Sequence, residues 1–420
     1  MRGGNPGAGG AISGLSVTEH KFFKLGLEDF NEVEDVADGI GPRMNLDSCG
    51  GCHSQPAVGG SSPALNPQVA FAIKDGGTDR VPSFIRADGP VREARFVRNP
   101  DGTPDGGVHA LFTITGRPGA GGCNLAQPDF EREVANRNVI FRIPTPLFGA
   151  GLIEQIPDAE ILANRDAQSA RKRDFGIRGR ANFRVAGRAN AGQSHRNGND
   201  GTIARFGWKA QNVSLLLFSG EAYNVEMGIT SELFQVERDE TAACQFATVP
   251  NDTQNFEAAD ALTGTTAIQN FANFQRLLAP PEPSADTPGG QASIGRGRAL
   301  FTSTGCALCH TPTLRTGNTA VVALRNQTVN LYSDLLVHDM GDGLADGVSQ
   351  GQAGPREFRS APLWGLGQRV FFLHDGRTSD LVQAIREHRS NGSAANRAVG
   401  NYDGLRESEK QDLLNFLRSL

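Results

Sequence analysis

The sequence predicts a mostly α protein built from two domains in tandem, with long ordered loops. At 420 residues the chain exceeds the usual length of one domain, and its 52 glycines and 22 prolines imply many turns and loops. The segment 279–290 (APPEPSADTPGG) contains four prolines and almost no apolar side chains, which is typical of a linker. We therefore predict an N-terminal domain over residues 1–280 and a C-terminal domain over residues 291–420.

Two pentapeptides of the form Cys-x-x-Cys-His occur, one in each predicted domain. This pattern attaches haem c, because two thiols bond to the porphyrin and the histidine binds the iron. A zinc site would need two further ligands nearby, and a dithiol redox motif does not need the histidine. The sequence therefore predicts two covalent haem groups. Their attachment residues are Cys49, Cys52 and His53 in the first site and Cys306, Cys309 and His310 in the second.

The C-terminal domain has the layout of a small cytochrome c. We expect a first helix over residues 293–305, just before the pentad, and a last helix that begins at Ser408 with Gln411 completing a capping box. Apolar residues at helical spacing follow in this last helix. Residues 142–151 (RIPTPLFGAG) faintly repeat as 359–367 (RSAPLWGLG), each downstream of its pentad. We therefore expect two cytochrome c-like haem domains, although the glycine content allows coincidence.

His388 is the best candidate for the second axial ligand of the C-terminal haem. Together with Leu381 and Ile385 it falls on one face of a short predicted helix, so the imidazole points toward the core. A core histidine bonded to a carbonyl explains the pattern equally well. Met340 and His338 are rivals, but their acidic, glycine-rich loop (VHDMGDG) favours a supporting role or a calcium site.

No strong second ligand is evident for the N-terminal haem. The candidates are Met44, His109, Glu154 and His195. Glu154 follows a glycine turn, and an acid above an open haem is suited to proton transfer during O–O cleavage; an ordinary exposed carboxylate is the plainer interpretation. An iron with two strong ligands transfers electrons, whereas an open iron binds peroxide or oxygen. The sequence thus indicates one haem of each kind.

The remaining features concern compartment and partners. Cys123 and Cys244 are left over, and we favour a disulfide between them over two free thiols. Haem c is attached outside the cytoplasm, so we expect an exported, periplasmic protein, here in a form without a signal peptide, because the first residues lack an apolar stretch. The net charge of −5 does not favour nucleic acid or a membrane surface, and no run approaches the ~20 apolar residues of a membrane span.

Residues 165–205 contain ten Lys or Arg against three Asp. A solvated face is the simplest interpretation; contacts to haem propionates or to an acidic electron donor are alternatives. Trp208 follows this segment and is either a core residue or an electron relay between the haems.

The chain resembles the bacterial di-haem oxidoreductase family, whose members are described as peroxidases. Five segments carry the resemblance: 41–49 (GPRMNLDSC), 146–154 (PLFGAGLIE), 205–210 (RFGWKA), 331–341 (LYSDLLVHDMG) and 372–377 (FLHDGR). More distantly the chain is similar to di-haem cytochrome c peroxidases and to MauG, which matures a tryptophan-derived cofactor.

In these relatives a His-Asp-Gly motif, here residues 374–376, precedes the helix that carries the distal ligand, and their spacing leads to His388. The peroxidases have Met there and MauG has Tyr, so His is a departure that should lower the potential of this haem. The resemblance implies peroxide reduction at the first haem, with electrons arriving through the second haem from a small redox protein. Two alternatives stay open: MauG-like oxidation of a protein or organic substrate, and a pure electron-transfer cytochrome.

Overall fold

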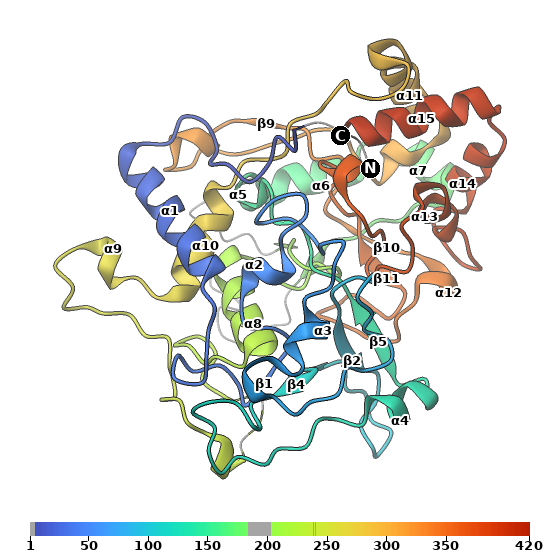
Figure 1. Ribbon diagram of the computed structural model, residues 1–420. Helices are drawn as coiled ribbons and strands as arrows, with labels where there is room; N and C mark the ends of the chain where they lie inside the picture. Colours follow the sequence, from blue (N-terminus) through green and yellow to red (C-terminus); the bar gives the residue numbers. More distant parts are fainter. Residues whose placement is uncertain (1–4, 184–202, 238, 240) are drawn as a thin grey trace.

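The computed structural model describes residues 5–183, 203–237, 239 and 241–420 (Figure 1). The helices are α1 (Val17–Asn31), α2 (Cys49–Cys52), α3 (Gln68–Phe71), α4 (Phe130–Ala135), α5 (Ala150–Glu154), α6 (Asp158–Asp166), α7 (Ser169–Phe175), α8 (Leu215–Met227), α9 (Ala261–Gly264), α10 (Ala267–Leu277), α11 (Gly290–Thr304), α12 (Gly341–Leu344), α13 (Leu381–Glu387), α14 (Asn396–Asp403) and α15 (Glu407–Ser419). The strands are β1 (Arg43–Met44), β2 (Glu93–Phe96), β3 (Val108–His109), β4 (Phe112–Thr113), β5 (Val139–Arg142), β6 (Asn182–Phe183), β7 (Ile203–Ala204), β8 (Leu314–Arg315), β9 (Thr328–Val329), β10 (Val337–Asp339) and β11 (Glu357–Arg359).

The expectation of a mostly α protein is confirmed only in part. The structure is mixed, 35% helical and 11% strand. The strands are short and lie in two- or three-stranded antiparallel sheets. The sequence analysis did not predict these strands, because segments of two to four residues are too short to show an alternation of apolar and polar side chains. The division into two domains stays a prediction, since one hydrophobic cluster joins residues as distant as Ile12 and Trp364.

The same helix arrangement occurs twice, once around each pentad. Helix α1 packs against α10 in the N-terminal part, and α11 packs against α15 in the C-terminal part (Figure 1). Glycine permits both close approaches: a Cβ on Gly26 would lie 2.2 Å from the carbonyl oxygen of Asn270, and one on Gly297 would lie 2.0 Å from that of Asp412. Each pair therefore needs a glycine at its crossing point, and each brackets one pentad in the chain.

The helix boundaries in the C-terminal part differ slightly from the expected ones. Helix α11 begins three residues earlier and ends before Gly305, whose φ of 102° suits glycine. Helix α15 begins at Glu407, and the predicted box at Ser408 does not form. Instead, the Glu409 carboxylate accepts the backbone N–H of Arg406 at 2.9 Å. An acidic side chain at this position also complements the helix dipole.

The three-stranded sheet brings charged side chains together from two separate segments. Its order is β3-β2-β5, and β2 pairs with β5 in the register Glu93↔Arg142 and Ala94↔Phe141. Side chains of alternate residues share a face of the sheet. Glu93, Arg95 and Arg142 consequently point to the same side, where the first candidate site lies.

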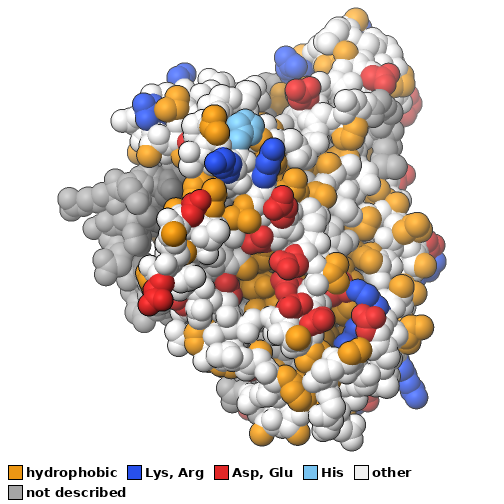
Figure 2. Space-filling view, turned by 60° about the vertical axis from the view of Figure 1, so that its left-hand side comes forward, with side chains coloured by type: hydrophobic (Ala, Val, Ile, Leu, Met, Phe, Trp, Pro, Cys, Tyr) orange, Lys and Arg blue, Asp and Glu red, His pale blue; other side chains and the backbone are white. Residues whose placement is uncertain are grey.

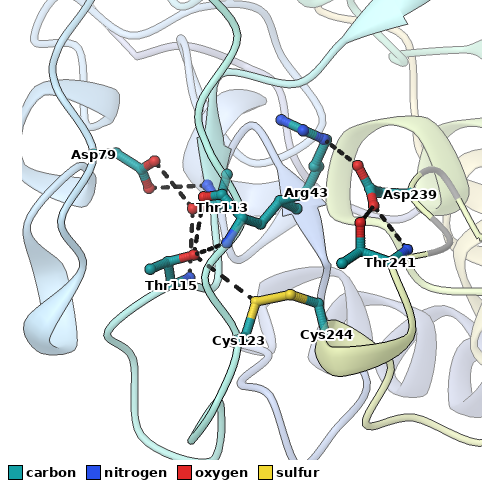
Figure 3. Close-up of a disulfide and its surroundings, with 9 residues drawn as sticks. Arg43, Asp79, Thr113, Thr115, Cys123, Asp239, Thr241 and Cys244 are labelled. Atoms are coloured by element: carbon teal, nitrogen blue, oxygen red, sulfur yellow. Dashed lines mark hydrogen bonds and ion pairs between the residues drawn. A yellow bond between two sulfur atoms is a disulfide. The ribbon is translucent and has the colours of Figure 1, made fainter.

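The predicted disulfide is confirmed. Cys123 and Cys244 are bonded across a sequence separation of 121 (Figure 3). Cys244 lies in a short 3-10 helix, residues 242–244, and nearby the Arg43 guanidinium pairs with Asp239 at 2.9 Å. The disulfide thus fastens the loop after β4 to the segment between α8 and α9.

The face of the molecule on the side of α1 and α10 is irregular and mixed in character. Figure 2 shows acidic side chains gathered near its centre, with hydrophobic side chains scattered between them. This distribution agrees with the net charge of −5. Within the described part of the chain, no helix is both long and apolar enough to cross a bilayer.

Candidate haem sites

The first pentad lies on α2 at the wall of a cavity with about 1120 Å³ of empty space, including its mouth. Ser48 caps this short helix, because its Oγ accepts the N–H of Gly51 at 3.2 Å. Cys49, Cys52 and His53 all line the cavity. The three attachment residues predicted for the first haem are therefore brought to one space.

The two thiols in this cavity are not a reactive pair. Burial raises the pKa of Cys49 to about 12, with Glu34 and Glu226 acting in the same direction. Burial also raises the pKa of Cys52 well above its ordinary value. Neither thiol therefore has the lowered pKa that is typical of a redox-active dithiol.

The second pentad lies at the wall of a larger cavity, with about 1540 Å³ of empty space. Cys306, Cys309 and His310 line it, and so does His388 from the end of α13. The Asp380 carboxylate caps α13 by accepting the N–H groups of Val382 and Gln383. This cap fixes the start of the helix. His388, at the end of the helix, and His310, from the pentad, therefore line the same cavity.

The three predicted iron-binding histidines are held in the same way. Nδ1 of His53 donates to the carbonyl of Gly60 at 3.0 Å. Nδ1 of His310 donates to Tyr332 at 3.1 Å, and Nδ1 of His388 donates to Ala384 at 2.7 Å. A histidine that binds a metal through one nitrogen commonly donates the other N–H to a carbonyl or carboxylate. Burial lowers the pKa of both His53 and His310 to about 4, which keeps the rings neutral, as a ligand must be.

The rivals for the second haem also line its cavity but are held differently. Both ring nitrogens of His338 are engaged: Nε2 with Asp334 at 2.9 Å and Nδ1 with the sulfur of Cys309 at 3.6 Å. Met340 contributes a thioether to the same wall. His388 has the ligand-like arrangement that His338 lacks, so we retain His388 as the candidate.

The remaining candidates for the first haem are not placed at its cavity. Met44 is fully buried in β1, opposite Phe112, and His109 pairs with Asp105 at 2.7 Å; neither lines the cavity. His195 lies outside the described residues. Met227, at the end of α8, does line the cavity and was missed by the sequence analysis, because nothing in the chain links α8 to the distant pentad.

Glu154 has a structural position and does not line either large cavity. Its side chain is fully buried in an ion pair with Arg276, at 2.7 Å. The other carboxylate oxygen accepts the N–H of Leu215 at 2.8 Å, at the start of α8. Both oxygens are thus occupied in joining α5, α8 and α10. The expectation that Glu154 transfers protons at the first haem is therefore not supported by its position.

A different pair of carboxyl groups does line the first cavity. Glu93 of β2 and Glu226 of α8 share a hydrogen bond. Arg95 binds Glu93 at 2.5 Å and keeps its pKa low despite its burial. Burial, together with the charge of Glu93, raises the pKa of Glu226 well above its ordinary value, so Glu226 carries the proton of the pair. The available signal was two acids, Glu221 and Glu226, in the largely apolar helix LLLFSGEAYNVEM, and Glu221 also lines the cavity.

Two partly buried arginines of the second cavity are suited to hold an anion. Arg359 and Arg369 line it, and burial, followed by the nearby charge of Arg369, lowers the pKa of Arg359 to about 10. Within the described part of the chain, they donate to backbone carbonyls, such as Arg369 to Pro362 at 2.8 Å. A buried charge needs a counter-charge, and haem carries two propionates. The donor set of this cavity therefore fits a haem group.

Trp208 lies between the two cavities. Its side chain lines both of them, together with Ile143. The indole N–H donates to the carbonyl of Ile143 at 2.9 Å, which fixes the ring. The sequence left open whether Trp208 is a core residue or a relay. The structure shows that it is buried and lines both cavities, which suits either role.

The structure lends little support to the binding roles considered for the acidic loop, residues 337–343, and for the basic segment, residues 165–205. Asp339 and Asp342 of the loop both pair with Arg356. Within the described ranges, no group of three or more His, Cys, Asp or Glu side chains is arranged to hold a metal ion. Residues 184–202 of the basic segment lie outside the described residues, and two of its arginines, Arg180 and Arg205, pair with Glu357 and Asp158.

Comparison with solved structures gives only remote similarity. Hydrazine synthase from Kuenenia stuttgartiensis is 15% identical, with 67% of this chain and 72% of that chain covered and a TM-score of 0.32. A MauG-like protein associated with microbial copper homeostasis is 20% identical, with coverages of 51% and 68% and a TM-score of 0.29. The dihaem peroxidase BthA from Burkholderia thailandensis is 16% identical, with coverages of 51% and 65% and a TM-score of 0.30.

No protein of curated function matches the sequence. The family described as "Di-haem oxidoreductase, putative peroxidase" matches residues 123–420, which is more than two thirds of the chain. The matched part contains the second pentad, Trp208 and His388. On this match the chain belongs to the di-haem oxidoreductase family.

Proposed function

We propose that this protein is an exported di-haem c-type oxidoreductase that reduces hydrogen peroxide. The observation that carries the proposal is the asymmetry of two cavities joined by Trp208. The second cavity presents two histidines with matching hydrogen bonds, His310 and His388, whereas His53 is the single histidine among the described residues that line the first. One site is then suited to electron transfer and the other to binding a small oxidant.

Bound haem would supply the redox chemistry, and the chain supplies ligation, protons and exclusion of water. His53 would hold the first iron, and His310 and His388 the second. Reduction of one H₂O₂ to two H₂O consumes two electrons and two protons. Glu226 is suited to deliver a proton, since its pKa is raised and Asn45 holds its carboxyl group at 2.6 Å. Glu93, fixed by Arg95, accepts the hydrogen bond that keeps this proton in place.

The electrons would come from a small redox protein through the second haem, with Trp208 on the path between the two cavities. Covalent haem c and a disulfide are both formed in an oxidising compartment, which supports a periplasmic location.

The test is an electron paramagnetic resonance spectrum of the ferric holoprotein, with and without a small excess of peroxide, after the haem content has been measured by mass. We expect two haems per chain, one high-spin signal and one low-spin signal, and loss of the high-spin signal on addition of peroxide. Two low-spin signals that ignore peroxide would instead establish an electron-transfer cytochrome. Reaction with peroxide without turnover by reduced cytochromes would favour oxidation of a protein or organic substrate.

A further inference from the structure

Lys209 is a fully buried lysine next to Trp208. Its ammonium group lies 3.0 Å from the Asp346 carboxylate and donates to the carbonyls of Gly354 at 2.9 Å and Glu357 at 3.0 Å. Transfer of an unpaired ammonium group into a protein interior is very costly, so this set of oxygens is what allows the charge to stay there. Burial lowers the pKa of Lys209 to about 8, while Asp346 acts in the opposite direction, so the group is mainly protonated at neutral pH.

The charges around Lys209 do not cancel. Asp346 also binds the guanidinium of Arg142 at 2.8 Å, and the side chains of both residues are at most 3% exposed. Two cations therefore share one carboxylate, which leaves one net positive charge in the cluster of Arg142, Lys209 and Asp346. Arg142 lines the first cavity, so the cluster reaches the wall of that site.

The same cluster reaches the second cavity through aromatic rings. The ammonium of Lys209 lies 3.9 Å from the centre of the Phe358 ring. On this ring stacks the imidazole of His374, with centres 4.2 Å apart and planes 25° apart. Phe358 and His374 both line the second cavity. The side chains of Lys209 and Asp346 are at most 1% exposed, and charges interact most strongly where the dielectric constant is low.

We propose that the fixed positive charge of Lys209 raises the reduction potential of the second haem. A nearby cation favours the reduced haem, which carries one electron more, over the oxidised haem. Two histidine ligands lower the potential of a haem relative to a His/Met pair, and Lys209 acts against this effect. The inference deepens the proposed function, on which it rests, by naming a residue that tunes the electron-transfer site. Lys209 touches neither a ligand histidine nor the cavity itself. It would act on the haem only through the electric field of its charge.

The measurement is a potentiometric titration of the holoprotein at neutral pH, followed by the absorbance of each haem. In Lys209→Met the side chain keeps its length and loses its charge. We expect the ratio of reduced to oxidised second haem at a given potential to fall about tenfold, or about 59 mV for a one-electron couple. Asp346→Asn removes the negative charge and, measured at mildly acidic pH where Lys209 keeps its proton without Asp346, should shift the potential upward. The double variant should return close to the wild-type value.

Arg117→Met is the matched control, because Arg117 is another buried cation over an aromatic ring. Its guanidinium lies 4.2 Å from the centre of Phe71 and donates to the carbonyls of Phe71, Lys74 and Thr113, away from both cavities. Its loss should lower thermal stability without moving either potential.

Unchanged potentials in both Lys209→Met and Asp346→Asn would overturn the inference. If Lys209→Met does not fold, Lys209→Gln takes its place, because the Gln amide can still donate to the carbonyls of Gly354 and Glu357 while the charge is lost. Potentials are measured without peroxide. A protein that ignores peroxide but shows these shifts would therefore contradict the proposed reaction and leave the inference standing.

Discussion

His310 and His388 line one cavity, and each donates its Nδ1–H to a backbone carbonyl. Burial lowers the pKa of both imidazole rings. A positive charge on His388 would lower the pKa of His310 further, so the two rings lie near each other. In each ring Nε2 is the nitrogen left for a ligand between them. Their shared cavity and matching hydrogen bonds fit two histidines that would both bind the iron of one haem.

Replacement of His388 should therefore convert the second haem from low-spin to high-spin. In His388→Ala the iron loses one axial ligand, while Cys306, Cys309 and His310 still attach the haem. We expect two haems per chain by mass and a second high-spin signal by electron paramagnetic resonance. His109→Ala is the control, because His109 pairs with Asp105 and lines neither cavity. A low-spin signal that survives in His388→Ala would assign the ligand to another residue, with Met340 tested next.

Loss of the shared proton in the first cavity should slow the reaction with peroxide. Glu226→Gln keeps the shape and removes the acid, so we expect the rate to fall by about 10²- to 10⁴-fold, the usual contribution of a general acid. Stopped-flow absorbance of the ferric protein after mixing with peroxide measures this rate.

Glu154→Gln provides the matched comparison for this prediction. It breaks a buried ion pair with Arg276, so it should lower the free energy of unfolding by about 3–5 kcal/mol. The peroxide rate of the folded protein should nevertheless stay near that of the wild type. The opposite pattern, a slow Glu154→Gln and a normal Glu226→Gln, would restore Glu154 as the proton donor.

Trp208→Phe should slow electron transfer between the haems without changing either haem spectrum. Phe keeps an aromatic ring at the wall of both cavities but loses the hydrogen bond to Ile143 and is harder to oxidise. The measurement is the rate at which the second haem is oxidised after peroxide is added to the half-reduced protein. Trp364→Phe is the control, since Trp364 lines neither of the two cavities. Equal rates in both variants would show that Trp208 is only a packing residue.

The sequence predicted best those features that are encoded locally. Each pentad is contiguous in the chain, and the helical spacing that places His388 on an apolar face lies within one helix. The haem attachment residues and His388 could therefore be named from the sequence. The roles of Glu154 and Glu226 could not. Each depends on a partner that is distant in the chain, Arg276 in one case and Glu93 in the other, and which acid meets a cavity is decided by tertiary packing.

Removal of the disulfide should affect stability but not the haem sites. Cys123→Ser with Cys244→Ser opens a long closed loop, and loss of a native disulfide typically lowers the free energy of unfolding by about 2–5 kcal/mol. Neither cysteine is among the described residues that line the two candidate haem cavities. Denaturant titration should show the loss, while absorbance and paramagnetic resonance spectra should match the wild type. Altered spectra in the folded variant would mean that the loop shapes the first site.

The protonation of Lys209 should make the potential of the second haem depend on pH. Because burial lowers the pKa of Lys209 to about 8, the ammonium loses its proton as the pH rises through this value, and the charge that favours reduction disappears. The sign is therefore a fall in the midpoint potential with rising pH around about 8.

Other groups near Lys209 do not change charge in this range. The charged or titratable neighbours are Asp346, Arg142, Glu357 with its partner Arg180, and His374. Hydrogen bonds and Arg180 lower the pKa of Glu357 although burial opposes them, and burial lowers the pKa of His374 to about 3, so that ring stays neutral. Arginine keeps its charge well above this range. Potentiometric titrations from neutral to moderately alkaline pH should show the step in the wild type and not in Lys209→Met. A step of equal size in both proteins would assign it to another group, such as a haem propionate.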